Sequence, residues 1–276
     1  MVILINNEGQ MCNRIKEFAH CIAHAIEKKE TLINVVWGDL DQYFEHERCS
    51  IKISVEANEN KAQAMGNIGK IIGKIIGKRN CKFNLLGKKY ELINDPEFYD
   101  WDALFAHKDE VLGYLKFSRQ YIERAQKKID EYKTETESIL VGVHVRRGDY
   151  KTWRNGKYYY TNEEYRCFFQ QFAENTNKNV TFVVCTNDSE LNASDLMGLN
   201  YSLKINGCDQ VTDLLVLSKC DYIMAPPSTY SWWAAFIGNC KYLTIVDRGM
   251  KISPSDFEHI GDRFVLGGGY EIYKDM

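Results

Sequence analysis

Two adjacent arginines and an aspartate follow an apolar run in the segment VGVHVRRGDY, residues 141–150. The apolar run predicts a strand, so Arg146, Arg147 and Asp149 would lie in the turn at its carboxyl end. Open α/β sheets bind ligands at that edge. Two guanidiniums there would suit a diphosphate, because each presents a rigid fork of N–H donors and keeps its charge. The alternative is that both arginines are only solvated, and the rest of the chain has to decide between them.

A second feature that favours an anion follows the predicted strand DYIMA. Pro226 and Pro227 end this strand, and Ser228 or Thr229 can cap the helix STYSWWAAFIG that comes next. The free backbone N–H groups and the dipole at a helix amino terminus attract phosphate. The arginines and this helix terminus could therefore bind one diphosphate together.

The elements that would position these residues alternate along the second half of the chain. Predicted strands such as SILVGVHV, VTFVVCTND and YLTIVD alternate with predicted helices such as QVTDLLVLSKC, which is typical of a parallel α/β domain. The amino terminus predicts a Rossmann-like opening, with a strand at residues 2–5, a polar loop, a helix with apolar positions from Ile15 to Ile26, and a strand at residues 31–37.

Length and local composition predict two domains. A chain of 276 residues is comfortable for two domains of about 150 residues each. A charged helix at residues 119–132 is followed by the polar stretch KTETES, which predicts a linker. We therefore expect a boundary near residue 135, between domains 1–135 and 136–276.

Composition excludes several classes of protein. Hydrophobic residues make up 45% of the chain and charged residues 26%, as in soluble globular proteins. A net charge of -3 argues against a general nucleic-acid binder. Nine cysteines without a C-x-x-C pair or a His/Cys cluster indicate reduced thiols, not disulfides or a structural metal. The apolar start MVILI is too short for a signal peptide or a membrane span, so we expect a cytoplasmic protein.

The segment GNIGKIIGKIIGKRN, residues 66–80, alternates isoleucine pairs with lysines. One interpretation is a basic amphipathic segment in peripheral association with an anionic membrane surface. The other, which we favour, is a surface helix or loop with an apolar underside.

Three segments carry a resemblance to a known family. HVRRGDY, residues 144–150, resembles the H-x-R-R-x-D-[YH] motif of α-1,2-fucosyltransferases, which α-1,6- and protein O-fucosyltransferases share in looser form. DLLVLSKCDYIMAPPSTYSWWAAFIG, which begins at Asp213, resembles the second signature of that superfamily. EGQMCNRIKEFAHCIAHA is a weaker match to the amino-terminal motif, in which Cys12 replaces a glycine and Arg14 a glutamine. Residues 50–137 have no counterpart.

The resemblance implies a GT-B glycosyltransferase with two facing Rossmann-like domains. The amino-terminal domain would lie on the acceptor side and the carboxyl-terminal domain would bind GDP-fucose. Such enzymes transfer L-fucose with inversion of the anomeric centre and without a metal or other cofactor. The acceptor would be a glycan, with α-1,2 linkage to a galactoside as the default. An enzyme of this kind without a Golgi-type anchor suggests bacterial surface-polysaccharide assembly at the cytosolic face of a membrane.

The resemblance also implies roles for individual residues. His144 and Asp213 would contact the guanine or its ribose. The diphosphate would meet the two arginines and the helix terminus, and Asn13 would lie near the reacting centre. The expected set is Arg146, Asn13 and Asp149 as catalytic residues, with His144, Arg146, Arg147, Asp213, Ser228, Thr229 and Tyr230 binding GDP-fucose.

Structural alternatives exist for several of these residues. Asp213 could cap the helix it begins, and His144 could be a hydrogen-bonded strand histidine. Trp232 and Trp233 suit core packing better than ligand stacking.

The catalytic base stays open at this stage. Inversion requires the acceptor hydroxyl to lose a proton, and a carboxylate is the usual base. Asp149 is the nearest candidate, although we favour a role in which it orients the arginines. Glu8 and Glu17 flank the first loop and are further candidates.

Two other functions are compatible with the sequence. VVWGDLD presents Asp39 and Asp41 as a D-x-D pair, the arrangement with which GT-A glycosyltransferases hold Mn²⁺. The chain could also be a catalytically silent module that binds a nucleotide sugar or a carbohydrate, which the substitutions Cys12 and Arg14 in the first loop leave open.

Overall fold

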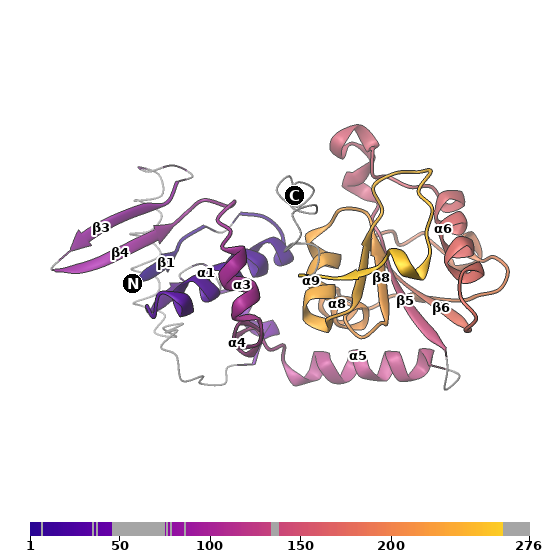
Figure 1. Ribbon diagram of the computed structural model, residues 1–276, viewed down its shortest axis with the longest axis horizontal. Coiled ribbons are helices and arrows are strands. Elements are labelled where there is room, and N and C mark those ends of the chain that lie inside the picture. Colours follow the sequence, from indigo (N-terminus) through magenta and orange to yellow (C-terminus); the bar gives the residue numbers. More distant parts are fainter. Residues whose placement is uncertain are drawn as a thin grey trace. The chain divides into compact units, whose positions relative to one another are not determined.

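The computed structural model describes residues 1–6, 8–34, 36, 38–45, 75, 77, 79–85, 87–133 and 138–261. The chain divides into two compact units, Met1–Ser118 and Arg119–Met276 (Figure 1). Most of the glycine and lysine repeat at residues 66–80 lies outside the described residues, so both interpretations of it stay open.

The first unit is a four-stranded sheet with helices on it. Strand order is β2-β1-β4-β3, in which β1 pairs in parallel with β2 and β4, and β3 is antiparallel to β4. The β1-loop-α1-β2 order confirms the opening predicted from the sequence. The elements are β1 (Val2–Leu4), α1 (Met11–Glu27), β2 (Leu32–Asn34), η1 (Asp41–Tyr43), β3 (Cys81–Leu85), β4 (Lys88–Ile93), α3 (Trp101–Ala106) and α4 (Lys108–Tyr114).

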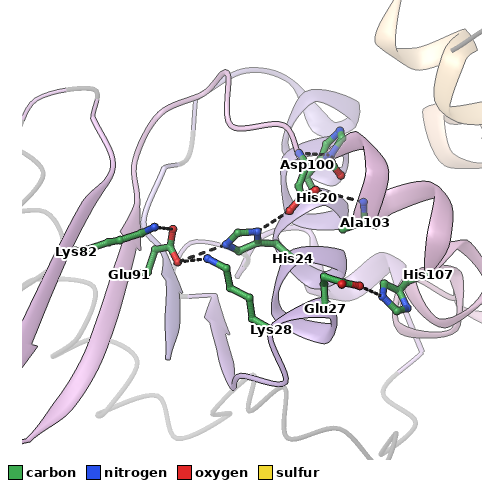
Figure 2. A network of polar contacts seen from close by, with 9 residues as sticks. All are labelled: His20, His24, Glu27, Lys28, Lys82, Glu91, Asp100, Ala103 and His107. Carbon is green, nitrogen blue, oxygen red and sulfur yellow. Dashed lines mark hydrogen bonds and ion pairs between the residues drawn. The ribbon is translucent and has the colours of Figure 1, made fainter. Parts of the chain in front are cut away.

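Polar side chains tie α1 to its neighbours in this unit (Figure 2). His24 lies between two carboxylates, with Nδ1 2.6 Å from Asp100 Oδ2 and Nε2 3.4 Å from Glu91 Oε2. Lys28 donates to the same Glu91 oxygen at 2.9 Å. The backbone N–H of Asp100 donates to Nδ1 of the buried His20 at 3.1 Å. Helix α1 is therefore held to β4 and to the start of α3 by hydrogen bonds as well as by its apolar face.

The second unit is a six-stranded sheet of order β10-β9-β8-β5-β6-β7. All neighbouring strands pair in parallel except β10, which is antiparallel to β9. This confirms the predicted parallel α/β arrangement. The elements are α5 (Arg119–Tyr132), β5 (Ile139–Val145), η2 (Gly148–Lys151), η3 (Trp153–Gly156), α6 (Asn162–Glu174), β6 (Val180–Thr186), α7 (Ala193–Leu196), β7 (Ser202–Asn206), α8 (Gln210–Leu217), β8 (Tyr222–Ala225), α9 (Thr229–Gly238), β9 (Lys241–Thr244), η4 (Pro254–Asp256) and β10 (Glu258–His259).

Side chains of the central strand β5 alternate between two packed faces. Val141, Val143 and Val145 belong to a buried cluster with the aromatic residues of α6. Gly142 lies against α8, where an added Cβ would be 2.8 Å from a methyl group of Leu217. Figure 1 shows α6 on one side of this sheet and α8 with α9 on the other. Strand β5 is therefore buried on both sides, as a parallel strand with helices on both faces must be.

Helix α5 belongs to the second unit. Its buried residues Ala125, Ile129 and Tyr132 lie on the face that packs against α8. The Tyr132 hydroxyl donates to Asn206 Oδ1 at the end of β7 at 2.8 Å. The boundary predicted near residue 135 falls after this helix, whereas the compact units divide before it, at Ser118. The difference arises because an amphipathic helix does not indicate in sequence which core its apolar face will cover.

Helix α9 depends on the absence of a side chain at its last residue. A Cβ on Gly238 would lie 1.9 Å from the backbone oxygen of Ser218, which cannot move aside as a flexible side chain would. Gly238→Ala should therefore lower the free energy of unfolding by about 1–3 kcal/mol, measured by urea denaturation. The helical Gly113 has no atom within 4 Å of an added Cβ. Gly113→Ala should be neutral or stabilising by up to about 1 kcal/mol, and equal losses in both variants would contradict this account.

Candidate functional site

The predicted donor-site residues of the second unit lie along one edge of its sheet. Strands β5, β6, β7 and β8 are parallel, so their carboxyl ends share that edge. His144 is near the end of β5 and Arg146 follows it, while Ser228 follows β8 and begins α9. Ligands of open α/β sheets bind at this edge. The fold therefore brings together segments that are far apart in the sequence.

His144 is a buried, neutral imidazole. Its exposed fraction is 4%, and its ring centroid lies 4.9 Å from that of Tyr230 in α9. Burial and, after it, the nearby charge of Arg146 lower the pKa of His144 to about 3. Its Nδ1 is buried and has no hydrogen-bond partner among the described residues. A buried polar atom without a partner is costly, and such atoms are typical of sites that a ligand completes.

Arg146 is oriented by residues of the turn that follows it. A guanidinium nitrogen lies 3.0 Å from Asp149 Oδ1, and the guanidinium carbon lies 5.5 Å from the ring centroid of Tyr150. The Tyr150 hydroxyl in turn donates to the backbone oxygen of Pro227 before α9. Asp149 is exposed and accepts from Arg146, which is the contact expected if it orients the arginine. The Arg146 side chain, 18% exposed, is thus held in place with part of its surface open.

Arg147 has different surroundings from its neighbour. Its guanidinium donates to the backbone oxygen of Tyr160 and, at 2.5 Å, to Asn162 Oδ1 at the start of α6. It also lies 4.9 Å from the ring centroid of Tyr159, and its residue is only 5% exposed. The two predicted diphosphate ligands therefore turn to opposite faces of the sheet, because side chains alternate along an extended chain. The hydrogen bonds that the Arg147 guanidinium donates to Tyr160 and Asn162 stabilise the fold.

Asp213 is held by polar groups at the end of β7 and in the loop before α8. Asp209, not Asp213, caps α8, because its side chain accepts from the N–H groups of the first turn. Asp213 Oδ1 accepts from Asn206 Nδ2 at 2.5 Å and from the Cys208 N–H at 3.2 Å. Asn206 is itself bound by Tyr132 of α5. Burial, as the largest cause, raises the pKa of Asp213 to about 7.

The amino terminus of α9 completes this group of residues. Ser228 caps the helix, with Oγ accepting from the Tyr230 N–H at 3.3 Å, and Thr229 is the first helical residue. The Tyr230 hydroxyl donates to the backbone oxygen of Gln210 at 2.6 Å, which connects α9 to α8. Both tryptophans of α9, Trp232 and Trp233, are at most 1% exposed. Their burial agrees with core packing.

Asn13 and the D-x-D pair lie in the first unit. Asn13 is a partly exposed residue in the first turn of α1, and Gly9 packs against its side chain with a φ of +89°. Arg14 donates to both carboxylate oxygens of Asp39, at 2.8 and 2.7 Å, and this hydrogen bonding lowers the pKa of Asp39. Asp39 is therefore a partner of an arginine.

Several polar residues that support the site were not predicted. Asn206, Tyr132 and Tyr150 hold predicted site residues or the turns around them, and Asn187 Oδ1 accepts from the Arg147 N–H at 2.8 Å. Asn187 had a signal in the sequence, because it lies at the end of a predicted strand, whereas Asn206 ends β7, a strand that was not predicted from the sequence. An asparagine at such a position can bind the backbone of the neighbouring turn.

Other features of the described ranges bear on ligands. Within those ranges, His, Cys, Asp and Glu side chains form no group of three that could hold a metal ion. No helix among the residues described combines the length and apolar composition needed to span a bilayer. A cavity of about 320 Å³ is lined by Lys28, Glu30 and the β3–β4 hairpin, and none of its lining residues is a predicted site residue.

A family comparison identifies the class of protein. The model of glycosyl transferase family 11 matches residues 5–262. The chain belongs to this family. It is therefore a glycosyltransferase. A comparison with curated proteins gives no significant match.

Solved structures similar to this glycosyltransferase confirm its fold. The NodZ α-1,6-fucosyltransferase of Bradyrhizobium, crystallised with GDP, has a TM-score of 0.60 and 12% identity, covering 88% of this chain and 94% of NodZ. A mutant of Arabidopsis thaliana FUT1 with GDP gives 0.60 and 11%, covering 94% of this chain and 73% of FUT1. POFUT1 with GDP gives 0.53 and 11%, covering 90% of this chain and 98% of POFUT1. The predicted GT-B fold is confirmed.

The alternative of a GT-A enzyme built on the D-x-D pair is wrong. The fold is of the GT-B type, and Asp39 is bound by Arg14 through both of its carboxylate oxygens. A D-x-D pair after a strand arises easily by chance, and here its first member forms an ion pair on the first unit.

The buried carboxyl of Asp213 should reduce stability as the pH rises. Its folded pKa of about 7 lies above its ordinary value of 3.8, so the unfolded chain loses this proton first and stability declines between about pH 4 and 7. Asp213→Asn keeps an oxygen that can accept from Asn206 and Cys208 but cannot ionise. The variant should exceed the wild type in unfolding free energy by on the order of 1–3 kcal/mol at pH 8, and by much less at pH 4. Urea denaturation at both pH values measures this, and a difference that does not change with pH would contradict it.

Proposed function

We propose that this family 11 glycosyltransferase transfers L-fucose from GDP-fucose to a glycan hydroxyl, with inversion and without a metal. The observation that carries the proposal is the convergence of Arg146, His144, Asp213 and the amino terminus of α9 at one sheet edge. It is supported by the sequence motifs and by the GDP found in the NodZ, FUT1 and POFUT1 structures.

The proposed donor site stabilises the leaving group with fixed charges. Departure of GDP leaves negative charge on the diphosphate, which preorganised donors can stabilise. Arg146 supplies a guanidinium already oriented by Asp149, and Thr229 with Tyr230 would contact the β-phosphate and the sugar at the start of α9. His144 and Asp213 would contact the guanosine, where a carboxylate and a neutral imidazole can accept and donate hydrogen bonds.

The proposed reaction is a displacement at the anomeric carbon. The acceptor oxygen bonds to that carbon from the face opposite GDP, and the bond from the carbon to the β-phosphate oxygen breaks with its electron pair. The hydroxyl proton passes to a base. Of the three candidate bases, Asp149 is bound to Arg146 and Glu17 is buried, whereas Glu8 is exposed in the first loop. We assign Asn13 a place near this reaction, as its motif suggests.

The acceptor and the location are proposed from the sequence alone. We propose α-1,2 linkage to a galactoside and a role in surface-polysaccharide assembly at the cytosolic face of a bacterial membrane. The domain nearer the acceptor would be the amino-terminal one.

Nucleotide binding is the first test of this proposal. Isothermal calorimetry should detect binding of GDP but not of UDP or ADP, and EDTA should leave the affinity unchanged. Transfer of fucose from GDP-fucose to a galactoside should likewise be insensitive to EDTA and to Asp41→Ala. A preference for UDP, or a loss of binding with EDTA, would overturn the donor assignment. GDP-fucose binding with neither transfer nor hydrolysis would favour a silent binding module.

The two adjacent arginines should respond differently to substitution. Arg146→Ala should weaken GDP binding about tenfold or more and lower kcat about 10²-fold or more, with little change in Tm. Arg146→Lys should also be impaired, because an ammonium cannot reproduce the planar fork. Arg147→Ala should instead lower the unfolding free energy by roughly 1–3 kcal/mol, because it leaves the Tyr160 carbonyl without its donor.

Arg166→Ala is the matched control for these variants. Arg166 lies on α6 and pairs only with the exposed Glu163 among the ion pairs described, at 3.1 Å. Its removal should change neither binding nor stability. An unchanged GDP affinity in Arg146→Ala would rule out the proposed contact between Arg146 and the diphosphate.

A further inference from the structure

The first unit contains a buried polar pair next to the segment from Glu8 to Asn13, which comprises the end of the first loop and the first turn of α1. Asn6 follows β1 and Glu17 lies in α1, with exposed fractions of 5% and 3%. Asn6 Nδ2 donates to Glu17 Oε2 at 2.7 Å. Asn6 Oδ1 accepts from the Glu8 backbone N–H at 3.3 Å. One side chain thus connects the helix to the backbone of the loop.

The pair holds this segment at both ends. Asn6 lies where the chain leaves the sheet, and Glu17 lies one helical turn after Asn13 on the same face of α1. Between them Gly9 adopts a φ of +89° and packs so closely against Asn13 that an added Cβ would lie 2.8 Å from the Asn13 Cβ. Glycine adopts this φ readily but leaves the backbone flexible, so contacts such as the Asn6–Glu17 hydrogen bond are needed to fix it.

The carboxyl of Glu17 is not explained by stability. Its neighbours include the charged or titratable groups of Glu8 in the loop, Asp95 and Tyr99 in the segment between β4 and α3, and Lys16 and Cys21 on its own helix. Burial, as the main cause, raises the pKa of Glu17 to about 8 and lowers that of Lys16 to about 8. Glu17 Oε1 is buried and has no hydrogen-bond partner among the described residues. An apolar side chain would fill this place without a half-satisfied polar group.

We propose that Asn6 and Glu17 are positioning residues, which fix the segment from Glu8 to Asn13 in the shape that fucosyl transfer requires. The inference rests on the proposed function. Glu17 acts through Asn6 and does not accept the proton of the acceptor hydroxyl. The role needs an oxygen at position 17 that accepts from Asn6, not a negative charge.

Three variants separate positioning from proton transfer. Asn6→Ala and Glu17→Leu remove the hydrogen bond, and kcat should fall about 10- to 100-fold. The KM for GDP-fucose and the Kd for GDP should stay within about twofold, because the donor residues lie in the second unit. Glu17→Gln keeps an acceptor for Asn6, so its kcat should stay within about threefold of the wild type at pH 7. Glu27→Gln, an exposed change on the same helix, is the matched control and should leave all values unchanged.

The pH profile and hydrogen exchange provide readouts that a general loss of packing would not produce. Because the ionised carboxylate also accepts from Asn6, wild-type kcat should not change as Glu17 ionises near pH 8, and Glu17→Gln should have the same pH profile; a kcat that rises with this ionisation only in the wild type would indicate proton transfer by Glu17. Amide exchange of residues 8–13 should accelerate in Asn6→Ala and Glu17→Leu and stay at the wild-type rate in Glu17→Gln.

Each outcome decides between the alternatives. If Glu17→Gln loses as much kcat as Glu17→Leu with normal exchange, Glu17 transfers the proton and the positioning role is overturned. Wild-type kcat and exchange in Asn6→Ala would also overturn it, and this variant decides the matter should Glu17→Leu fail to fold. If the wild type transfers no fucose, the proposed function fails, while exchange at residues 8–13 still shows whether the pair fixes the segment.

Discussion

The alternation of side chains along β5 is the constraint on which the proposed donor site depends. A parallel strand covered by helices on both faces must bury every side chain, and each residue commits its neighbours to one face or the other. Val141, Val143 and Val145 pack towards α6. His144 is thereby placed against α9, and the same alternation at the strand end separates Arg146 from Arg147. The side chain of Arg146 keeps part of its surface open, whereas that of Arg147 is buried against α6.

Burial of ionisable groups links the structure to the proposed chemistry. Burial is the main cause that lowers the pKa of His144 and raises the pKa values of Asp213 and Glu17, and each shift favours the neutral form. Such groups reduce stability, since the unfolded chain can ionise them in water. Each lies where a strand or its following loop meets a helix. Asp213 and Glu17 each accept a hydrogen bond from an asparagine, and His144 and Glu17 each have one buried polar atom without a partner among the described residues. This pattern is typical of residues retained for a ligand or for positioning and less typical of a stabilising core.

The sequence was sufficient for the fold class and for the proposal that the two motifs of the second unit meet at one sheet edge. The alternation of predicted strands and helices indicated a parallel sheet. The turns after β5 and β8 were recognised from Arg146 and from Pro226 with Ser228. Arg147 shows the limit. Adjacency in the sequence was interpreted as adjacency in space, although a period of two already separates neighbours. The apolar face of α5 was visible as well, but nothing in its spacing indicated that α8 would cover it.

The supporting polar residues were harder to predict for a physical reason. Asn206 acts through the groups it connects, Tyr132 and Asp213, and asparagine at a strand end is common in turns without any ligand. Asn6 is the same case in the first unit. Only the tertiary structure shows that their donors and acceptors are both used in buried positions.

The separation of the two arginines changes how charge is balanced at the proposed donor site. With Arg147 engaged by α6, a bound diphosphate would meet one guanidinium and the amino terminus of α9. Both are fixed before a ligand arrives, because Asp149 and Tyr150 orient Arg146, and Tyr150 also bonds the turn before α9. Tyr150 therefore couples the position of the guanidinium to that of the helix terminus. Preorganised donors need no rearrangement as charge develops on the leaving group, which is how a small number of them can replace a metal ion.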